Sequence, residues 1–202
     1  ATQAVEVNGK MSIGESGKLE IAAEDVSLNS PTSVSGSLDI NADSLSTRGQ
    51  LWVSSKGKVT LGDSEGNSLK KAVIENLNTQ GTVDFYAEEL EFEKRVSVNT
   101  ETANVTIHNV STADGTDQKT TFMAGILTGN KAKLTVESGT VVSYGVIQAN
   151  PGSTISLGSD NSPLTLLEMA GQSVTAKNAL LRSYEANLTI VADKVAVSQP
   201  QG

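Results

Sequence analysis

The sequence predicts an all-β fold, a parallel β-solenoid with coils of roughly 20 residues. Three observations lead to this prediction. Short apolar pairs alternate with polar residues along most of the chain, similar segments recur at a nearly constant spacing, and aromatic residues make up only 3% of the 202 residues. Alternation with a period of two is typical of strands that bury one face.

The composition fits narrow strands and turns better than a thick globular core. Hydrophobic residues account for 37% of the chain, and the net charge is −8. These values also fit disorder, but the regular apolar alternation argues against it. The acidic charge balance argues against nucleic acid as a partner, because phosphate binding needs a basic face. Cysteine is absent, which excludes a disulfide framework and thiolate metal sites.

Alternating apolar pairs predict short strands from the first residues to the last. They are Val5/Val7, Met11/Ile13, Leu19/Ile21, Val26/Leu28, Leu38/Ile40, Leu51/Val53, Val59/Leu61, Val83/Phe85, Leu90/Phe92, Val96/Val98, Val105/Ile107, Leu134/Val136, Ile155/Leu157, Leu164/Leu166, Leu188/Ile190 and Val195/Val197.

The spacing between equivalent pairs sets the length of a coil. The pairs that begin at Leu19, Leu38 and Val59 are 19 and 21 residues apart. The 105 residues from Val83 to Leu188 correspond to five further steps of 21. A single coil cannot bury its inward residues alone, so we expect like residues to stack in neighbouring coils.

One motif recurs in four places, with apolar positions on either side of Ala-Asp or Ala-Glu. It is found in residues 19–29 (LEIAAEDVSLN), 38–49, 83–93 and 188–198. We expect the alanine to lie at a tight corner, where a bulky side chain would not fit, and the acidic residue to point outward.

The whole chain, residues 1–202, is predicted to form one solenoid domain, and we expect it to be a piece of a longer protein. The first residues lack the basic and apolar regions of a signal peptide. No apolar run approaches the length needed to span a bilayer, so we expect no membrane insertion in this segment.

Two stretches interrupt the regular pattern and are predicted excursions from the coil. Residues 67–82 place Leu69, Val73 and Leu77 at helix-like spacing, which predicts a short helix or an irregular coil. Residues 111–133 begin as a polar loop.

Loops that leave a solenoid commonly carry recognition, although insertions without a role are also common. We therefore take four residues of the second stretch as candidate binding residues: Asp114, Asp117, Lys119 and Phe122.

No motif supports a catalytic, cofactor or metal site, and we expect none. The segment GDSEGNS (62–68) resembles the nucleophile segment of trypsin-like proteases. However, Glu65 replaces a required glycine, and His108 follows the serine instead of preceding it. The same segment fails as an EF-hand loop, because Ile74 stands where the closing glutamate belongs. His108 has no cysteine or second histidine to share a metal.

The chain resembles the passenger region of Gram-negative autotransporter adhesins and of filamentous-haemagglutinin-like exoproteins. The resemblance is carried by GKLEIAAEDVSLNS, by GSLDINADSLSTRGQLWVSSKGKVTLGDSEGN and by GTVVSYGVIQANPGSTISLG. It implies a right-handed parallel β-helix, secretion across the outer membrane to the cell surface, and adhesion or self-association. The membrane barrel of the autotransporters and the secretion domain of the exoproteins are missing here. No binding residue is carried over.

These observations favour a non-catalytic bacterial surface adhesin that binds a host-cell glycan, a host protein or a second copy of itself. Two alternatives remain open. One is a β-helix enzyme acting on polysaccharide, such as a lyase or a tailspike-like glycosidase, and the other is a structural spacer. The enzyme would need a groove with clustered acids, arginines and aromatic platforms, and the chain has only seven aromatic residues.

Overall fold

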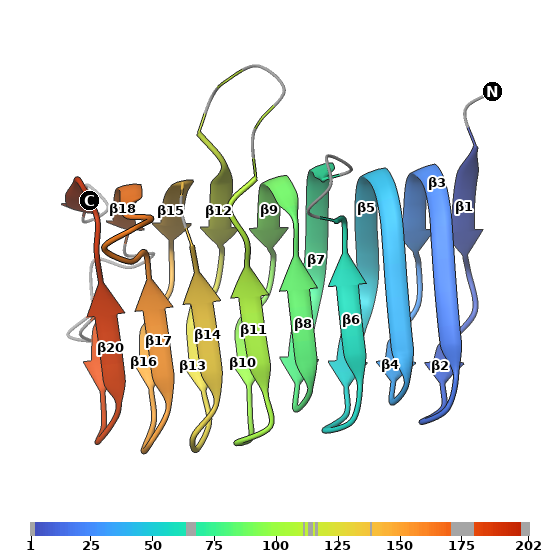
Figure 1. Ribbon diagram of the computed structural model, residues 1–202, viewed down its shortest axis with the longest axis horizontal. Helices are drawn as coiled ribbons and strands as arrows, with labels where there is room; N and C mark the ends of the chain where they lie inside the picture. Colours follow the sequence, from blue (N-terminus) through green and yellow to red (C-terminus); the bar gives the residue numbers. More distant parts are fainter. Residues whose placement is uncertain are drawn as a thin grey trace.

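The computed structural model describes residues 3–63, 68–110, 112, 115, 117–137, 139–170 and 180–198. Within these residues the protein consists of 21 strands, joined through parallel pairings into one sheet that winds into a solenoid (Figure 1). No helix among them is long and apolar enough to cross a membrane. The predicted β-solenoid is confirmed.

Each complete coil contributes one strand segment to each of three faces, and several long strands bend from one face to the next. Face 1 contains the start of β3 (Lys18–Leu28) and of β5 (Ser37–Val53), then β6 (Lys58–Leu61), β8 (Thr82–Phe85), β11 (Asn104–Ile107), β14 (Lys133–Val136), β17 (Thr154–Leu157) and β20 (Asn187–Ile190).

Face 2 contains β1 (Ala4–Val7), later parts of β3 and β5, the start of β7 (Leu69–Thr79), β9 (Ala87–Phe92), β12 (Lys119–Phe122), β15 (Gly139–Ser143), β18 (Leu164–Ala170) and β21 (Val195–Ser198). Face 3 contains β2 (Met11–Ile13), β4 (Thr32–Val34), the ends of β5 and β7, β10 (Val96–Val98), β13 (Ile126–Thr128), β16 (Ile147–Ala149) and β19 (Leu181–Ser183).

The coils wind in a right-handed sense. In Figure 1 the face 1 strands nearest the viewer run upward, the strands behind them run downward, and the chain advances from right to left. Nine strands follow one another on face 2, so at about 4.8 Å per strand the stack is roughly 38 Å long.

Equivalent residues pair across neighbouring coils, but the steps between them are less even than the sequence predicts. On face 1, Val83 and Leu188 are linked through the equivalent residues Val105, Leu134 and Ile155 of the coils between them. The steps from one coil to the next are therefore four, of 22, 29, 21 and 33 residues. The prediction of five steps was wrong, because two of the coils are longer than the rest. Part of the extra length lies between β11 and β12.

The core is a narrow column of inward side chains. It includes three phenylalanines, Phe85, Phe92 and Phe122, none of which is exposed to solvent. The rings of Phe92 and Phe122 stack with their centroids 5.1 Å apart, because β9 and β12 pair them in register. Phe85 meets Phe92 edge to face at 5.4 Å. The aromatic stack fills a volume that the aliphatic rungs on either side fill with smaller residues.

Hydroxyl side chains replace apolar ones at several inward positions of face 3. The Thr79 hydroxyl donates to the carbonyl of Gly81 at 3.1 Å and accepts from its N–H at 3.0 Å. Thr128 and Ser153 share a buried hydroxyl–hydroxyl bond of 2.7 Å. These hydrogen bonds pair the buried hydroxyls with polar groups of the turn that follows face 3, so the hydroxyls are buried without an unpaired donor.

The described residues 68–82 stay within the coil, which contradicts the predicted excursion over 67–82; residue 67 lies outside the described residues. Within this stretch the structure describes 68–82, and β7 runs through it and pairs with β5 and β9. Leu69 and Leu77 are buried, while Val73 points outward from face 2. Because β7 bends from face 2 to face 3, its buried residues, Leu69, Ala72, Ile74, Leu77 and Thr79, are not evenly spaced by two. The helix-like spacing of Leu69, Val73 and Leu77 mixes inward and outward residues of one bent strand.

The corner alanines are inward, but the corner does not require small residues. Ala23 pairs with Ala42, whereas Ala87 pairs with the fully buried Leu69. The acidic neighbour of Ala42, Asp43, is exposed, as expected.

The register of β5 against β7 shifts between Thr47 and Gln50, and side chains of the following coils stabilise this irregular segment. Gly49 has φ +109°, a left-handed conformation that favours glycine, and its N–H donates to the Glu75 carboxylate. The Lys94 ammonium donates to the same carboxylate. The Lys94 contact first, and then the Gly49 N–H, lowers the pKa of Glu75 below its ordinary value.

We predict that Phe122→Ala lowers the free energy of unfolding by about 3–5 kcal/mol, because it removes the buried ring that stacks on Phe92 and leaves a cavity. The matched control is Thr121→Ala on the outward side of the same strand, with an expected change of about 0.5 kcal/mol or less. Urea unfolding followed by circular dichroism measures both. Equal losses in the two variants would contradict the proposed core.

We also predict that Glu75→Gln destabilises the protein at neutral pH and not in acid. Because the folded-state pKa of Glu75 is lowered, its stabilising effect is fully present above the unfolded-state pKa. It disappears as the pH falls through the lowered pKa. Unfolding curves from pH 7 down to pH 2.5 should converge for wild type and variant. Glu91→Gln, which removes an outward carboxylate from the adjacent strand β9, is the control.

Candidate functional site

The four predicted binding residues do not form one surface. Asp117 and Lys119 are exposed, and Asp114 lies outside the described residues. Phe122 is fully buried against Phe92, so its assignment as a binding residue was wrong. The alternation that buries Leu90 and Phe92 in β9 continues in β12 and turns the Phe122 ring inward.

The predicted excursion 111–133 is also shorter than expected. Within it, β12 and β13 belong to faces 2 and 3 and pair with the coils on both sides. At the turn from face 1 to face 2, called here the first corner, the described residues between Ile107 and Lys119 lie outside the strands. Whether the loop at this corner binds a partner stays a prediction.

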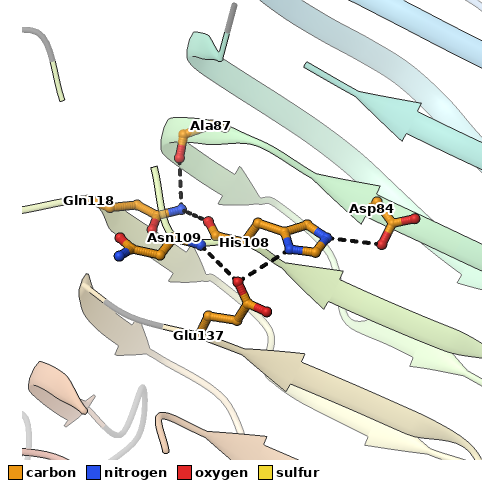
Figure 2. Close-up of polar contacts among 6 residues, drawn as sticks. All are labelled: Asp84, Ala87, His108, Asn109, Gln118 and Glu137. Carbon is orange, nitrogen blue, oxygen red and sulfur yellow. Dashed lines mark hydrogen bonds and ion pairs between the residues drawn. The ribbon is translucent and has the colours of Figure 1, made fainter. Parts of the chain in front are cut away.

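A polar cluster lies at the base of that loop and joins three successive coils (Figure 2). Tyr86, His108 and Glu137 each directly follow a face 1 strand, so they occupy equivalent positions at the first corner. The rings of Tyr86 and His108 stack with centroids 4.2 Å apart and an angle of 5° between their planes. Parallel, in-register coils produce this stacking, because they place equivalent side chains directly above one another.

The imidazole of His108 lies between two carboxylates. Its Nε2 is 3.1 Å from Oδ1 of Asp84, and its Nδ1 is 3.2 Å from Oε2 of Glu137. The same Glu137 oxygen accepts from the N–H of Asn109 at 3.2 Å. A neutral imidazole has one N–H and can donate to one carboxylate, whereas the imidazolium can donate to both. Protonation of His108 therefore adds a second bond between coils.

Gln118 fastens the end of the loop to this cluster. Its side-chain N–H₂ group donates to the carbonyls of Ala87, at 2.9 Å, and of His108, at 2.8 Å. The side chain is buried, and its Oε1 has no hydrogen-bond partner among the described residues. The amide orientation is fixed, because only the nitrogen can donate to two carbonyls.

Negative charge gathers on the outer side of the cluster. Burial first, and then the charges of Asp84, Glu137 and Asp63, raises the pKa of the Tyr86 hydroxyl above its ordinary value. Asp63 follows β6 at the same corner and accepts a hydrogen bond of 3.3 Å from Asn41. The first corner is therefore an acidic strip that runs over several coils.

The geometry of the cluster does not fit hydrolysis through a histidine base or a bound metal. A histidine that activates a hydroxyl needs one ring nitrogen facing that hydroxyl, and both nitrogens of His108 face carboxylates. Metal ligands must converge on one point, whereas these carboxylates lie on opposite sides of the ring. Across the described residues, no group of three or more metal-ligating side chains is arranged to hold an ion. Residues 64–67 of GDSEGNS lie outside the described residues.

Sequence reasoning singled out His108 but not its partners. The sequence contained part of the information needed to find the cluster. Each of its three corner residues, Tyr86, His108 and Glu137, comes directly after an alternating apolar pair. Recognising the cluster requires the coil register, including the long step from Val105 to Leu134, and the unequal steps hide that register.

We predict that Gln118→Glu lowers the free energy of unfolding by about 2–4 kcal/mol at pH 7, because a buried carboxylate would face two carbonyls without a donor. Burial raises the pKa of such a carboxyl, so protonation should restore part of the loss as the pH falls from 7 towards 5. Gln118→Leu, which does not titrate, serves as the control. A deficit for Gln118→Glu that is independent of pH would contradict the two hydrogen bonds.

No family model, curated protein or solved structure matches the chain.

Proposed function

We propose that this chain is the non-catalytic passenger part of a bacterial surface adhesin, located outside the outer membrane. In this proposal the stack presents long flat faces to a host-cell glycan, a host protein or a second copy of the chain. The observation that carries the proposal is the arrangement of outward polar side chains in straight rows along the stack.

The clearest row is on face 1. The strand register pairs each outward residue of this row with the equivalent residue of the next coil, and most of these residues carry a hydroxyl group. The row is Thr60, Asp84, Thr106, Thr135, Ser156 and Thr189. Adjacent members are about 4.8 Å apart. Such a row offers the same hydrogen-bonding group many times at a fixed spacing, which suits a repetitive or extended partner.

Surface charge supports an acidic rather than a basic binding face. Several lysines are paired to carboxylates of other coils, among them Lys56 to Glu15, Lys70 to Asp43 and Lys131 to Glu101, at 2.8, 2.8 and 3.2 Å. Exposed pairs of this kind contribute little to stability. They do neutralise positive charge along the stack, and the chain keeps its net charge of −8.

Rigidity makes weak contacts useful. Every coil is joined to the next by parallel ladders on its faces, so the rows keep their spacing when one contact forms. Once one contact has formed on a rigid body, the partner is held at a high effective concentration near the other contacts, so several weak contacts together give a much higher overall affinity. Copies clustered on a cell surface would add a further gain of the same kind.

The test is to display the described chain on a non-adhesive bacterium and on beads. We expect retention on a glycan array or on host cells, or aggregation of the displaying cells, without release of any product from the bound partner. Beads carrying many copies should bind at least tenfold more strongly than the free chain.

Two outcomes would replace the proposal. Release of shortened oligosaccharides would assign the polysaccharide-acting enzyme. Absence of binding, aggregation and turnover would assign the spacer. Display of a chain with Phe122→Ala provides a control for binding by unfolded material.

A further inference from the structure

A shallow groove of about 380 Å³ crosses the C-terminal coils at the edge of face 1 and the first corner. Its volume lies near the lower end of the range of small-molecule sites, about 300–1,000 Å³. It is lined by side chains of β14, β17 and β20 and by the residues that directly follow these strands. The lining residues that matter here are Thr135, Glu137, Ser156, Asp160, Thr189 and Val191.

Hydroxyl groups form the floor of the groove. Thr135 pairs with Ser156, and Ser156 pairs with Thr189, so the three hydroxyls follow one another on successive coils. None of them makes a side-chain hydrogen bond within the part of the chain that the structure describes. Each hydroxyl can donate once and accept twice.

Two carboxylates, Glu137 and Asp160, line the groove at the first corner. Glu137 is held by His108 and by the N–H of Asn109, at 3.2 Å each, as Figure 2 shows. Asp160 is carried by a tight turn, in which the N–H of Ser159 donates to the Ser162 carbonyl at 2.9 Å and the N–H of Ser162 returns a bond of 3.1 Å. A carboxylate can accept strong, charge-assisted hydrogen bonds from the hydroxyls of a ligand.

Gly158 allows two coils to approach each other beneath the groove. Its φ is +76°, and a Cβ at this position would lie 2.1 Å from the carbonyl oxygen of Val191. Val191, which is partly exposed, supplies the apolar side chain of the lining. The groove therefore combines a hydroxyl row, two acceptors and one small apolar surface, a combination that suits the hydroxyls and a C–H face of a sugar ring.

Charge limits which sugars fit. The lining residues include two carboxylates and no lysine or arginine, and Asp84 and Asp63 continue the acidic strip along the same corner. A uronic acid, a sialic acid or a sulfated sugar would be repelled. Resting on the proposed adhesive function, we propose that this groove binds an uncharged saccharide unit of an extended glycan.

The test uses the full chain with neutral gluco-, galacto- and manno-oligosaccharides and with oligogalacturonate, followed by saturation-transfer NMR and calorimetry. We expect binding of at least one neutral series. Ser156→Ala and Asp160→Ala should each weaken it by about 5–20-fold, through loss of one hydrogen bond. Thr121→Ala, on face 2 and outside both the face 1 row and the groove, should leave it unchanged. Thermal unfolding of each variant checks that the fold is intact.

The inference is overturned if no neutral series binds, if the groove variants bind as well as Thr121→Ala, or if oligogalacturonate binds more tightly. The adhesion assay separates the two proposals. Retention on cells or aggregation that Ser156→Ala and Asp160→Ala leave unaffected would keep the adhesive function and reject the groove. Saccharide binding accompanied by product release would keep the groove and reject the adhesive function.

Discussion

Parallel, in-register hydrogen bonding between neighbouring coils is the constraint on which the rest of the structure depends. It places each residue directly above its counterpart one coil earlier, whatever the length of the loop between them. The stacked pair of Phe92 and Phe122, the hydroxyl row on face 1 and the stacked rings of Tyr86 and His108 all follow from it. The core and the surface are therefore organised by the same spacing.

The fold was predictable because apolar alternation needs no knowledge of register. Leu19, Leu38 and Val59 lie on one ladder, as their spacing indicates. Two kinds of detail were hidden. A strand that bends from one face to another, as β7 does, changes which residues point inward, so its apolar pattern loses the regular alternation. Extra residues lengthen two of the steps, to 29 and 33, so counting in steps of 21 gives one coil too many.

The site was less predictable than the fold, for a physical reason. Polar side chains on an outer face follow no sequence pattern of their own, and the contacts they make depend on which residues lie one coil above and one coil below. His108 acquires its carboxylate partners only through neighbours 24 and 29 residues away. A polar loop drew attention to the correct corner, but Phe122 belongs to the core because β12 continues the alternation of β9.

The step of 29 residues from Val105 to Leu134 has a further consequence. Asn104 still pairs with Lys133, and Ile107 with Val136, although the connection carries extra residues. Segment length at this corner is thus uncoupled from strand register, because both anchor points are fixed by ladders that the loop does not join. The corner can serve as a grafting position, where peptides of different length and composition are exchanged while the rod that carries them keeps its dimensions.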